Sequence, residues 1–175
     1  MGIRFARSSG RLAMCGIALA AFSSGALADS VSADVSASAT LVRTLAITST
    51  TGLSFGTLAP SGTAGTVVIA PDGARSVTGG VTLLSANVGS AGAVNLVGTA
   101  SLAYTVTMPT SVTLTAAGGS QTMTLSSLST NLTGAAGTLN STGNGNFSIG
   151  GSLAVGANQA VASYAGIVPV TVNWN

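Results

Sequence analysis

Glycine and proline interrupt this 175-residue chain at short intervals, and this spacing limits what it can fold into. Pro71-Asp72-Gly73, Gly79-Gly80, Gly118-Gly119 and Gly150-Gly151 are typical turn signals. The runs between such breaks are short and rich in Val, Thr and Ser, which favours strands, and none shows a helical period. The expected strands are Gly65–Ala70, Val81–Ala86, Leu102–Met108, Val112–Thr115, Thr122–Leu128 and Ala160–Trp174. The pattern predicts one all-β domain, a sandwich or a barrel, with a Gly- and Asn-rich loop over residues 130–147.

The first 28 residues have the organisation of a secretory signal peptide. Three arginines precede an apolar stretch, Leu12–Phe22, which is too short to cross a bilayer. Ala26-Leu27-Ala28 has the small-x-small pattern of a cleavage site, so we expect cleavage between Ala28 and Asp29. Export to the periplasm, the cell surface or the medium follows from this. The lone Cys15 leaves with the signal peptide, so the mature chain has no disulfide.

The composition excludes most enzyme chemistry. The chain has no His, and all of its basic residues are Arg and all of its acidic residues Asp. This excludes an imidazole base, a Ser-His-Asp triad, a Schiff-base lysine and a phosphate-binding lysine. After signal removal Arg43 and Arg75 stand against Asp29, Asp34 and Asp72, a net charge of −1. We therefore expect no enzymatic activity, no metal or cofactor site and no nucleic-acid partner.

Two smaller expectations follow from the same residues. Asp72 and Arg75 flank a turn and are expected to form a local ion pair. Residues 29–175 contain no apolar run of about 18 residues, so no helix spanning a membrane is expected after signal removal.

The clearest alternation lies directly after the expected cleavage site, in residues 29–42, which we call the arm. An extended strand here has one apolar and one polar face. The apolar residues are Val31, Ala33, Val35, Ala37, Ala39 and Leu41. The arm is therefore a candidate donor strand that pairs with another molecule. It is equally well the first strand of its own sandwich, and the alternation alone does not choose between the two.

A second alternating segment ends the chain. Its apolar face carries Tyr164, Val168, Val170, Val172 and Trp174. Pro169 lies on the opposite face, and because proline has no N–H to donate, it favours the edge of a sheet. A long apolar edge strand invites pairing with another chain unless something covers it. We therefore predict that this C-terminal segment, residues 164–174, is the acceptor edge for a neighbour's arm.

Four segments resemble a secreted bacterial family known as domain of unknown function 4402: Leu53–Pro60, Gly65–Thr82, Phe147–Gln159 and Tyr164–Trp174. The resemblance implies an immunoglobulin-like antiparallel β-sandwich, distantly similar to spore coat U-type and chaperone–usher pilin subunits. It also implies a periplasmic chaperone and an usher as partners. The chain departs from the family pattern at Ala162, where glycine is common, and at Pro169.

These observations predict a secreted structural protein without enzymatic activity, a subunit of a surface pilus (fimbria) or coat that self-assembles by β-strand addition. The alternative is a monomeric cell-surface or periplasmic binding module for carbohydrate or adhesion. Such a module needs an exposed aromatic beside amide side chains, and Trp174 between Asn173 and Asn175 is the candidate.

Overall fold

The computed structural model describes residues 36–174. The expected signal peptide (1–28), the cleavage site at Ala28 and Asp29, and the arm residues Val31, Ala33 and Val35 lie outside the described residues. The chain divides into two units, residues 1–40 and 41–175. In the first unit, residues 36–40 form no strand or turn and are exposed. All the strands described below belong to the second unit.

The second unit is built from short antiparallel strands, and no α-helix occurs between residues 36 and 174. The strands are β1 (Leu45–Thr51), β2 (Leu58–Ala59), β3 (Gly65–Ile69), β4 (Arg75–Gly79), β5 (Thr82–Leu83), β6 (Gly92–Gly98), β7 (Ala103–Thr107), β8 (Ser111–Ala116), β9 (Thr122–Thr130), β10 (Ala136–Thr138), β11 (Asn144–Val155), β12 (Tyr164–Ala165) and β13 (Thr171–Trp174). A single 3-10 turn, η1 (Thr133–Ala135), precedes β10. The all-β fold predicted from the sequence is therefore confirmed.

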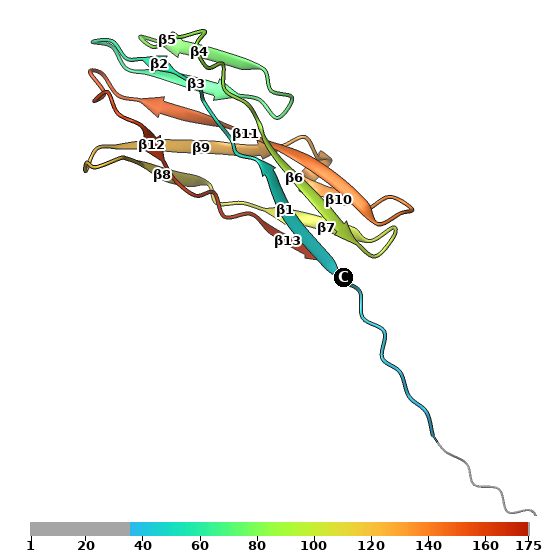
Figure 1. The fold of residues 1–175 in the computed structure, drawn as a ribbon. Helices are drawn as coiled ribbons and strands as arrows, with labels where there is room; N and C mark the ends of the chain where they lie inside the picture. The colour runs from blue at the N-terminus through green and yellow to red at the C-terminus, as the bar shows by residue number, and fades with distance from the viewer. Residues whose placement is uncertain (1–35, 175) are drawn as a thin grey trace, which may run out of the picture. The chain divides into compact units, whose positions relative to one another are not determined.

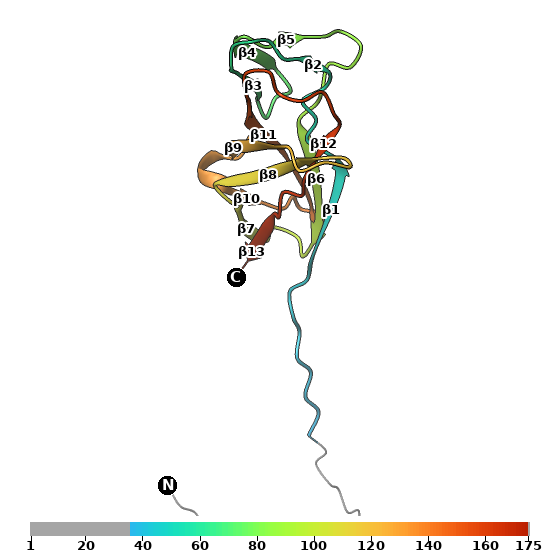
Figure 2. The same cartoon turned by 90° about the vertical axis from the view of Figure 1, so that its left-hand side faces the viewer.

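The strands form one large sheet and two small ones. The large sheet has the order β1-β6-β11-β9-β8-β12, with β3 and β4 attached beside β11. The small sheets are β10-β7-β13 and β2-β5. β11 is long enough to pair along one edge first with β6 and then with β3, while its other edge pairs with β9. In both views β2 to β5 gather at one end of the unit, and β7, β10 and β13 lie at the other (Figure 1, Figure 2).

Two clusters of buried side chains form the core. The first lies between the large sheet and the β10-β7-β13 sheet and contains Val94, Leu96, Leu102, Tyr104, Val106, Leu139, Phe147, Ile149 and Val172. The second lies where the large sheet curls, and contains Phe55, Val67, Ile69, Val81, Met123, Leu125, Leu153 and Val155. The buried residues alternate along β6, β7 and β9, as expected for strands with one face on the core. Packing of two sheets through a shared apolar layer gives the unit its sandwich-like build.

The predicted loop over residues 130–147 is wrong in part, because it contains β10 and the start of β11. Asn144 and Asn146 point outward from β11 and are exposed. Gly145 between them faces the core, where an added Cβ would meet Leu139 and approach Tyr104. Glycine occupies position 145 because the core leaves no room for a Cβ on that side of the strand. The chain does not turn there.

The predicted continuous C-terminal strand is also wrong. β12 pairs with β8 in the large sheet and β13 pairs with β7 in the small one, and residues 166–170 between them belong to no strand. Pro169 lies in this gap, and its lack of an N–H explains why the ladder is interrupted there. Val168 and Val170 are still half-buried and Val172 is buried, so the alternation of faces survives the break.

Candidate functional site

An open groove of about 930 Å³ lies between β1 and the C-terminal segment. One wall is formed by Ile47, Ser49 and Thr51 of β1, and the other by Tyr164, Gly166, Val168 and Val170. The floor consists of apolar side chains from both core clusters. These floor residues include Val94, Met123, Leu125, Ile149, Leu153 and Val155. The groove therefore exposes part of the apolar core along the edge of the large sheet.

Ile47 shows most directly that this part of the core is uncovered. It is the cross-strand partner of Leu96, so both side chains lie on the core-facing side of the sheet. Leu96 is fully buried, whereas Ile47 is 46% exposed. β1 is the last strand of its sheet, and within residues 36–174 no strand pairs with its outer edge. A core-facing isoleucine at an open edge leaves room for one more strand.

The backbone of β1 is oriented to receive that strand. The Thr99 N–H donates to the Thr44 carbonyl at 3.0 Å, which identifies Thr44 as a residue hydrogen-bonded toward β6. Hydrogen-bonded residues alternate in antiparallel ladders, so the N–H and C=O groups of Leu45, Ile47 and Ser49 point to the open edge. An incoming strand can thus form a ladder with β1 while every second side chain enters the groove.

One end of the groove is fixed by a close crossing of two loops. Ser54 and Ser90 exchange backbone hydrogen bonds of 2.9 and 2.8 Å. The Arg75 guanidinium donates to the carbonyls of Thr57 (3.0 Å) and Asn87 (3.4 Å), which both line the groove. Arg75 thus ties the two loops together.

We expected Arg75 to form a local ion pair with Asp72, but its guanidinium donates to the two loop carbonyls instead. Asp72 instead accepts a hydrogen bond from the Ala74 N–H through Oδ1 at 2.9 Å, within its own turn. The turn itself forms as predicted, with the Gly73 N–H donating to the Ala70 carbonyl at 2.8 Å. The side chain of Arg75 leaves the turn because two carbonyls of the neighbouring loops are within its reach.

The predicted site residues lie in different places: some line the groove, two C-terminal residues lie elsewhere, and the described arm residues belong to no strand. Tyr164, Val168 and Val170 line the groove, whereas Val172 is buried in the first core cluster and Trp174 lies at a separate hollow. Of the arm residues, Ala37, Ala39 and Leu41 are described and belong to no strand. Leu41, in the second unit, is 91% exposed.

Sequence reasoning missed β1 as a groove wall. The residues of β1 that face the core are Leu45, Ile47, Ser49 and Thr51. Only the first two are apolar, so the alternation of apolar and polar residues along this strand is short. The only signal was that Leu45 and Ile47 alternate with Ala46 and Thr48. That is too short a pattern to distinguish an open edge strand from any other short strand.

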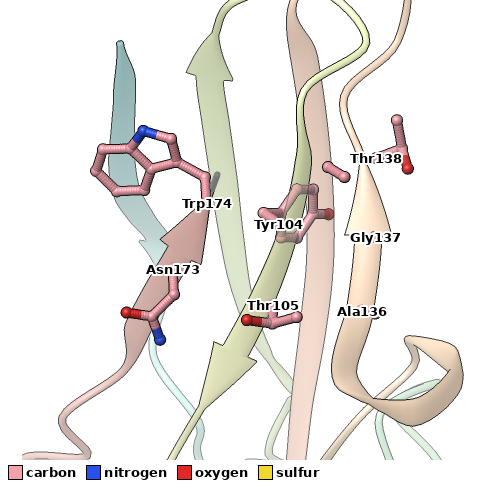
Figure 3. A pocket seen from close by; sticks show the side chains of 8 residues that line it. Tyr104, Thr105, Ala136, Gly137, Thr138, Asn173 and Trp174 are labelled. Atoms are coloured by element: carbon pink, nitrogen blue, oxygen red, sulfur yellow. The ribbon is translucent and has the colours of Figure 1, made fainter. Parts of the chain in front are cut away.

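The separate hollow, of about 350 Å³, lies on the β10-β7-β13 sheet. Figure 3 shows it with Asn173 and Trp174 on β13, Tyr104 and Thr105 on β7, and residues 136–138 on β10. The ring of Tyr104 packs over Gly137, where an added Cβ would meet its phenol group. This close approach requires glycine at position 137.

Burial of Tyr104 makes the stability of the fold sensitive to alkali. Desolvation raises the pKa of Tyr104 above its ordinary value of about 10. Between that value and the raised one the unfolded state loses a proton that the folded state keeps, so the free energy of unfolding falls as the pH rises. We expect Tyr104→Phe to reduce this alkaline loss in urea titrations at pH values from about 9 to 12. An unchanged alkaline loss in Tyr104→Phe would contradict the assignment.

Comparison with known proteins identifies a family but no characterised relative. A family model described as domain of unknown function DUF4402 matches residues 45–174. No curated protein and no solved structure matches the chain. Within residues 36–174 no helix is long and apolar enough to cross a membrane. The match covers the strands from β1 to β13 and therefore both walls of the groove.

Proposed function

The chain belongs to the DUF4402 family, and we propose that it is an exported structural protein without enzymatic activity, whose copies assemble into a surface pilus or coat by strand addition. In this proposal the arm of one copy fills the groove of the next. The observation that carries the proposal is the uncovered Ile47 on β1, at an edge whose outward backbone groups have no strand partner within the described residues.

The arm has the pattern that the groove requires. Its apolar residues recur at every second position from Val31 to Leu41, so one face of an extended arm is apolar throughout. The groove offers an apolar floor, and the open backbone edge of β1 runs along one of its walls. Burying a Val or Leu side chain contributes about 1.5–3 kcal/mol, and hydrogen bonds to β1 add directionality.

The link between the arm and β1 argues against filling the groove from within the same copy. Leu41-Val42-Arg43-Thr44 contains no Gly, Pro, Asn or Asp, the residues that tight hairpin turns favour. The described residues 41–44 are exposed and form no turn. An arm parallel to β1 in its own groove needs a crossover of about a dozen residues, and only these four are available.

The directions of the groove walls favour head-to-tail assembly. β1 starts, and β13 ends, at the same end of the second unit, so the two walls run in opposite directions (Figure 1, Figure 2). We place the incoming arm parallel to β1 and antiparallel to the C-terminal segment. The donor then enters from the end opposite to the one where the acceptor's own arm begins. Such a contact does not close on itself and extends into a fibre.

An uncovered groove makes the free subunit prone to aggregation. We therefore propose that a periplasmic chaperone covers the groove during export and that an usher exchanges it for the arm, the partners that the family resemblance implies. Chaperone and usher genes beside the gene for this chain are the expected genomic context.

The test compares the mature chain, residues 29–175, with a variant lacking residues 29–42. We expect light scattering to show a series of oligomers for the first and a folded monomer for the second. A synthetic peptide of residues 29–42 should raise the melting temperature of the shortened variant, because a ligand of the folded state stabilises it. A peptide of the same composition with the alternation scrambled is the control. If the full mature chain is a monomer and the deletion unfolds it, the arm acts within its own copy and the proposal fails.

A further inference from the structure

The segment before β12, residues 156–163, borders the groove at the end of the second unit where β2 to β5 gather, and we call it the rim loop. Its residues 159–163 line the groove, as does Leu58 of β2. The Asn158 N–H donates to the Ser61 carbonyl at 2.7 Å, so the rim loop lies beside the loop between β2 and β3 (Figure 2). The proposed assembly brings in a neighbour's arm at this end of the groove.

Side-chain hydrogen bonds brace the rim loop. Gln159 accepts from the Gly156 N–H through Oε1 at 3.3 Å and donates through Nε2 to the Tyr164 hydroxyl at 2.8 Å. That hydroxyl in turn donates to the Ala160 carbonyl at 2.8 Å. Val161, in the middle of this braced segment, is nevertheless 93% exposed. A braced loop loses little conformational entropy when a partner covers its apolar side chain, which favours binding.

The arm has a matching irregularity at its C-terminal end. Polar residues occupy the even positions from Ser30 to Thr40, but the next even position is Val42. Leu41 and Val42 therefore place apolar side chains on both faces of an extended chain, and they are 91% and 76% exposed. The floor of the groove covers only one face of an incoming strand. The side chain of Val42 stays in water unless a second surface covers it.

Chain length places Val42 at the boundary between two assembled copies. The chain from Val42 to Leu45, where β1 begins, spans at most about 10 Å when fully extended. The arm therefore leaves its own copy at Val42. When the alternating residues up to Leu41 lie in the groove of the next copy, Val42 lies where the arm enters, beside the rim loop.

We propose that Val42 of one copy packs against Val161 on the rim loop of the next copy, while Leu41 enters the groove. This inference rests on the proposed strand addition and adds the contact that determines how far the arm enters. A shift of the arm by two residues keeps the same face in the groove, because the side-chain period of a strand is two. Such a shift separates Val42 from Val161, so the contact selects one register among those that the alternation allows.

Serine substitutions in the full mature chain, residues 29–175, test this contact. Sedimentation velocity over a dilution series measures the concentration at which half of the assembled protein dissociates. Val42→Ser and Val161→Ser should each raise this concentration about tenfold, the effect of losing one buried apolar contact. The double variant should dissociate at the same concentration as either single variant, because each substitution alone removes the same contact.

The matched control is Ile167→Ser, which removes a similarly exposed apolar side chain from the C-terminal segment but does not alter the lining of the groove. It should assemble like the unmodified chain, and circular dichroism should show the same fold for every variant. The inference is overturned if either valine can be replaced without loss, if Ile167→Ser weakens assembly equally, or if the two losses multiply in the double variant. A monomeric unmodified chain refutes strand addition itself, so the two failures are distinguishable.

Discussion

We expect a mixture of Ile47→Lys subunits and Val35→Asp subunits to form a two-subunit complex and nothing longer, and each variant alone to stay a monomer. Ile47→Lys puts a charge on the wall of the groove, so in the proposed assembly this copy should donate its arm but accept none. Val35→Asp puts a charge on the apolar face of the arm, so that copy should accept an arm but not donate its own. Burying an unpaired charge costs several kcal/mol, enough to abolish either step. Native mass spectrometry of the two variants and their mixture measures the result.

The control is Thr48→Lys, which adds the same charge one residue further along β1 on the outward face. It should assemble like the unmodified chain. Because Ile47 is half-exposed, Ile47→Lys should also remain folded, which circular dichroism checks. Oligomers larger than two in the mixture, or self-association of either variant alone, rule out one arm per groove as the mode of assembly.

Gly56→Ala is expected to be among the most destabilising small substitutions in the fold. Gly56 has a φ of +73°, and a Cβ at this position would collide with the Asn87 carbonyl at the loop crossing that ends the groove. The left-handed conformation costs an alanine about 1–2 kcal/mol, and forced displacement of packed backbone adds about 1–3 kcal/mol. We therefore expect the free energy of unfolding to fall by about 2–5 kcal/mol in urea denaturation.

Two other glycines separate these contributions. Gly73 has a φ of +88° but open space around it, so Gly73→Ala should cost only the conformational part, about 1–2 kcal/mol. Gly52 has neither a positive φ nor a neighbour within 4 Å, so Gly52→Ala should leave stability unchanged or raise it by up to about 1 kcal/mol. Equal losses for Gly56→Ala and Gly73→Ala would show that the loop crossing does not constrain position 56.

The fold class and seven of the thirteen strands could be predicted because they depend on local patterns. Each of the six expected runs overlaps a strand, and the Pro71-Asp72-Gly73 turn forms where its residues predict it. The errors arose where tertiary packing decided the outcome. Gly145 lies in a strand at a position where a core side chain leaves no room for a Cβ, and composition alone cannot distinguish such a glycine from one in a loop.

Only one of the two walls of the groove could be predicted from the sequence. The alternation of Val168 and Val170 revealed one wall, because side-chain period is a property of a single segment. The other wall, at Ile47, lies more than a hundred residues earlier in the chain, and only the sheet order shows that it is an edge. In the hollow, Asn173 and Trp174 were evident as sequence neighbours, whereas Thr105 and Thr138 join them only through strand pairing.

Strand β11 belongs to both core clusters, with Phe147 and Ile149 in the first and Leu153 and Val155 in the second. Because one continuous backbone supplies both, neither cluster can melt without pulling a strand out of the other. We therefore expect the second unit to unfold as a single cooperative block, although its apolar interior has two centres.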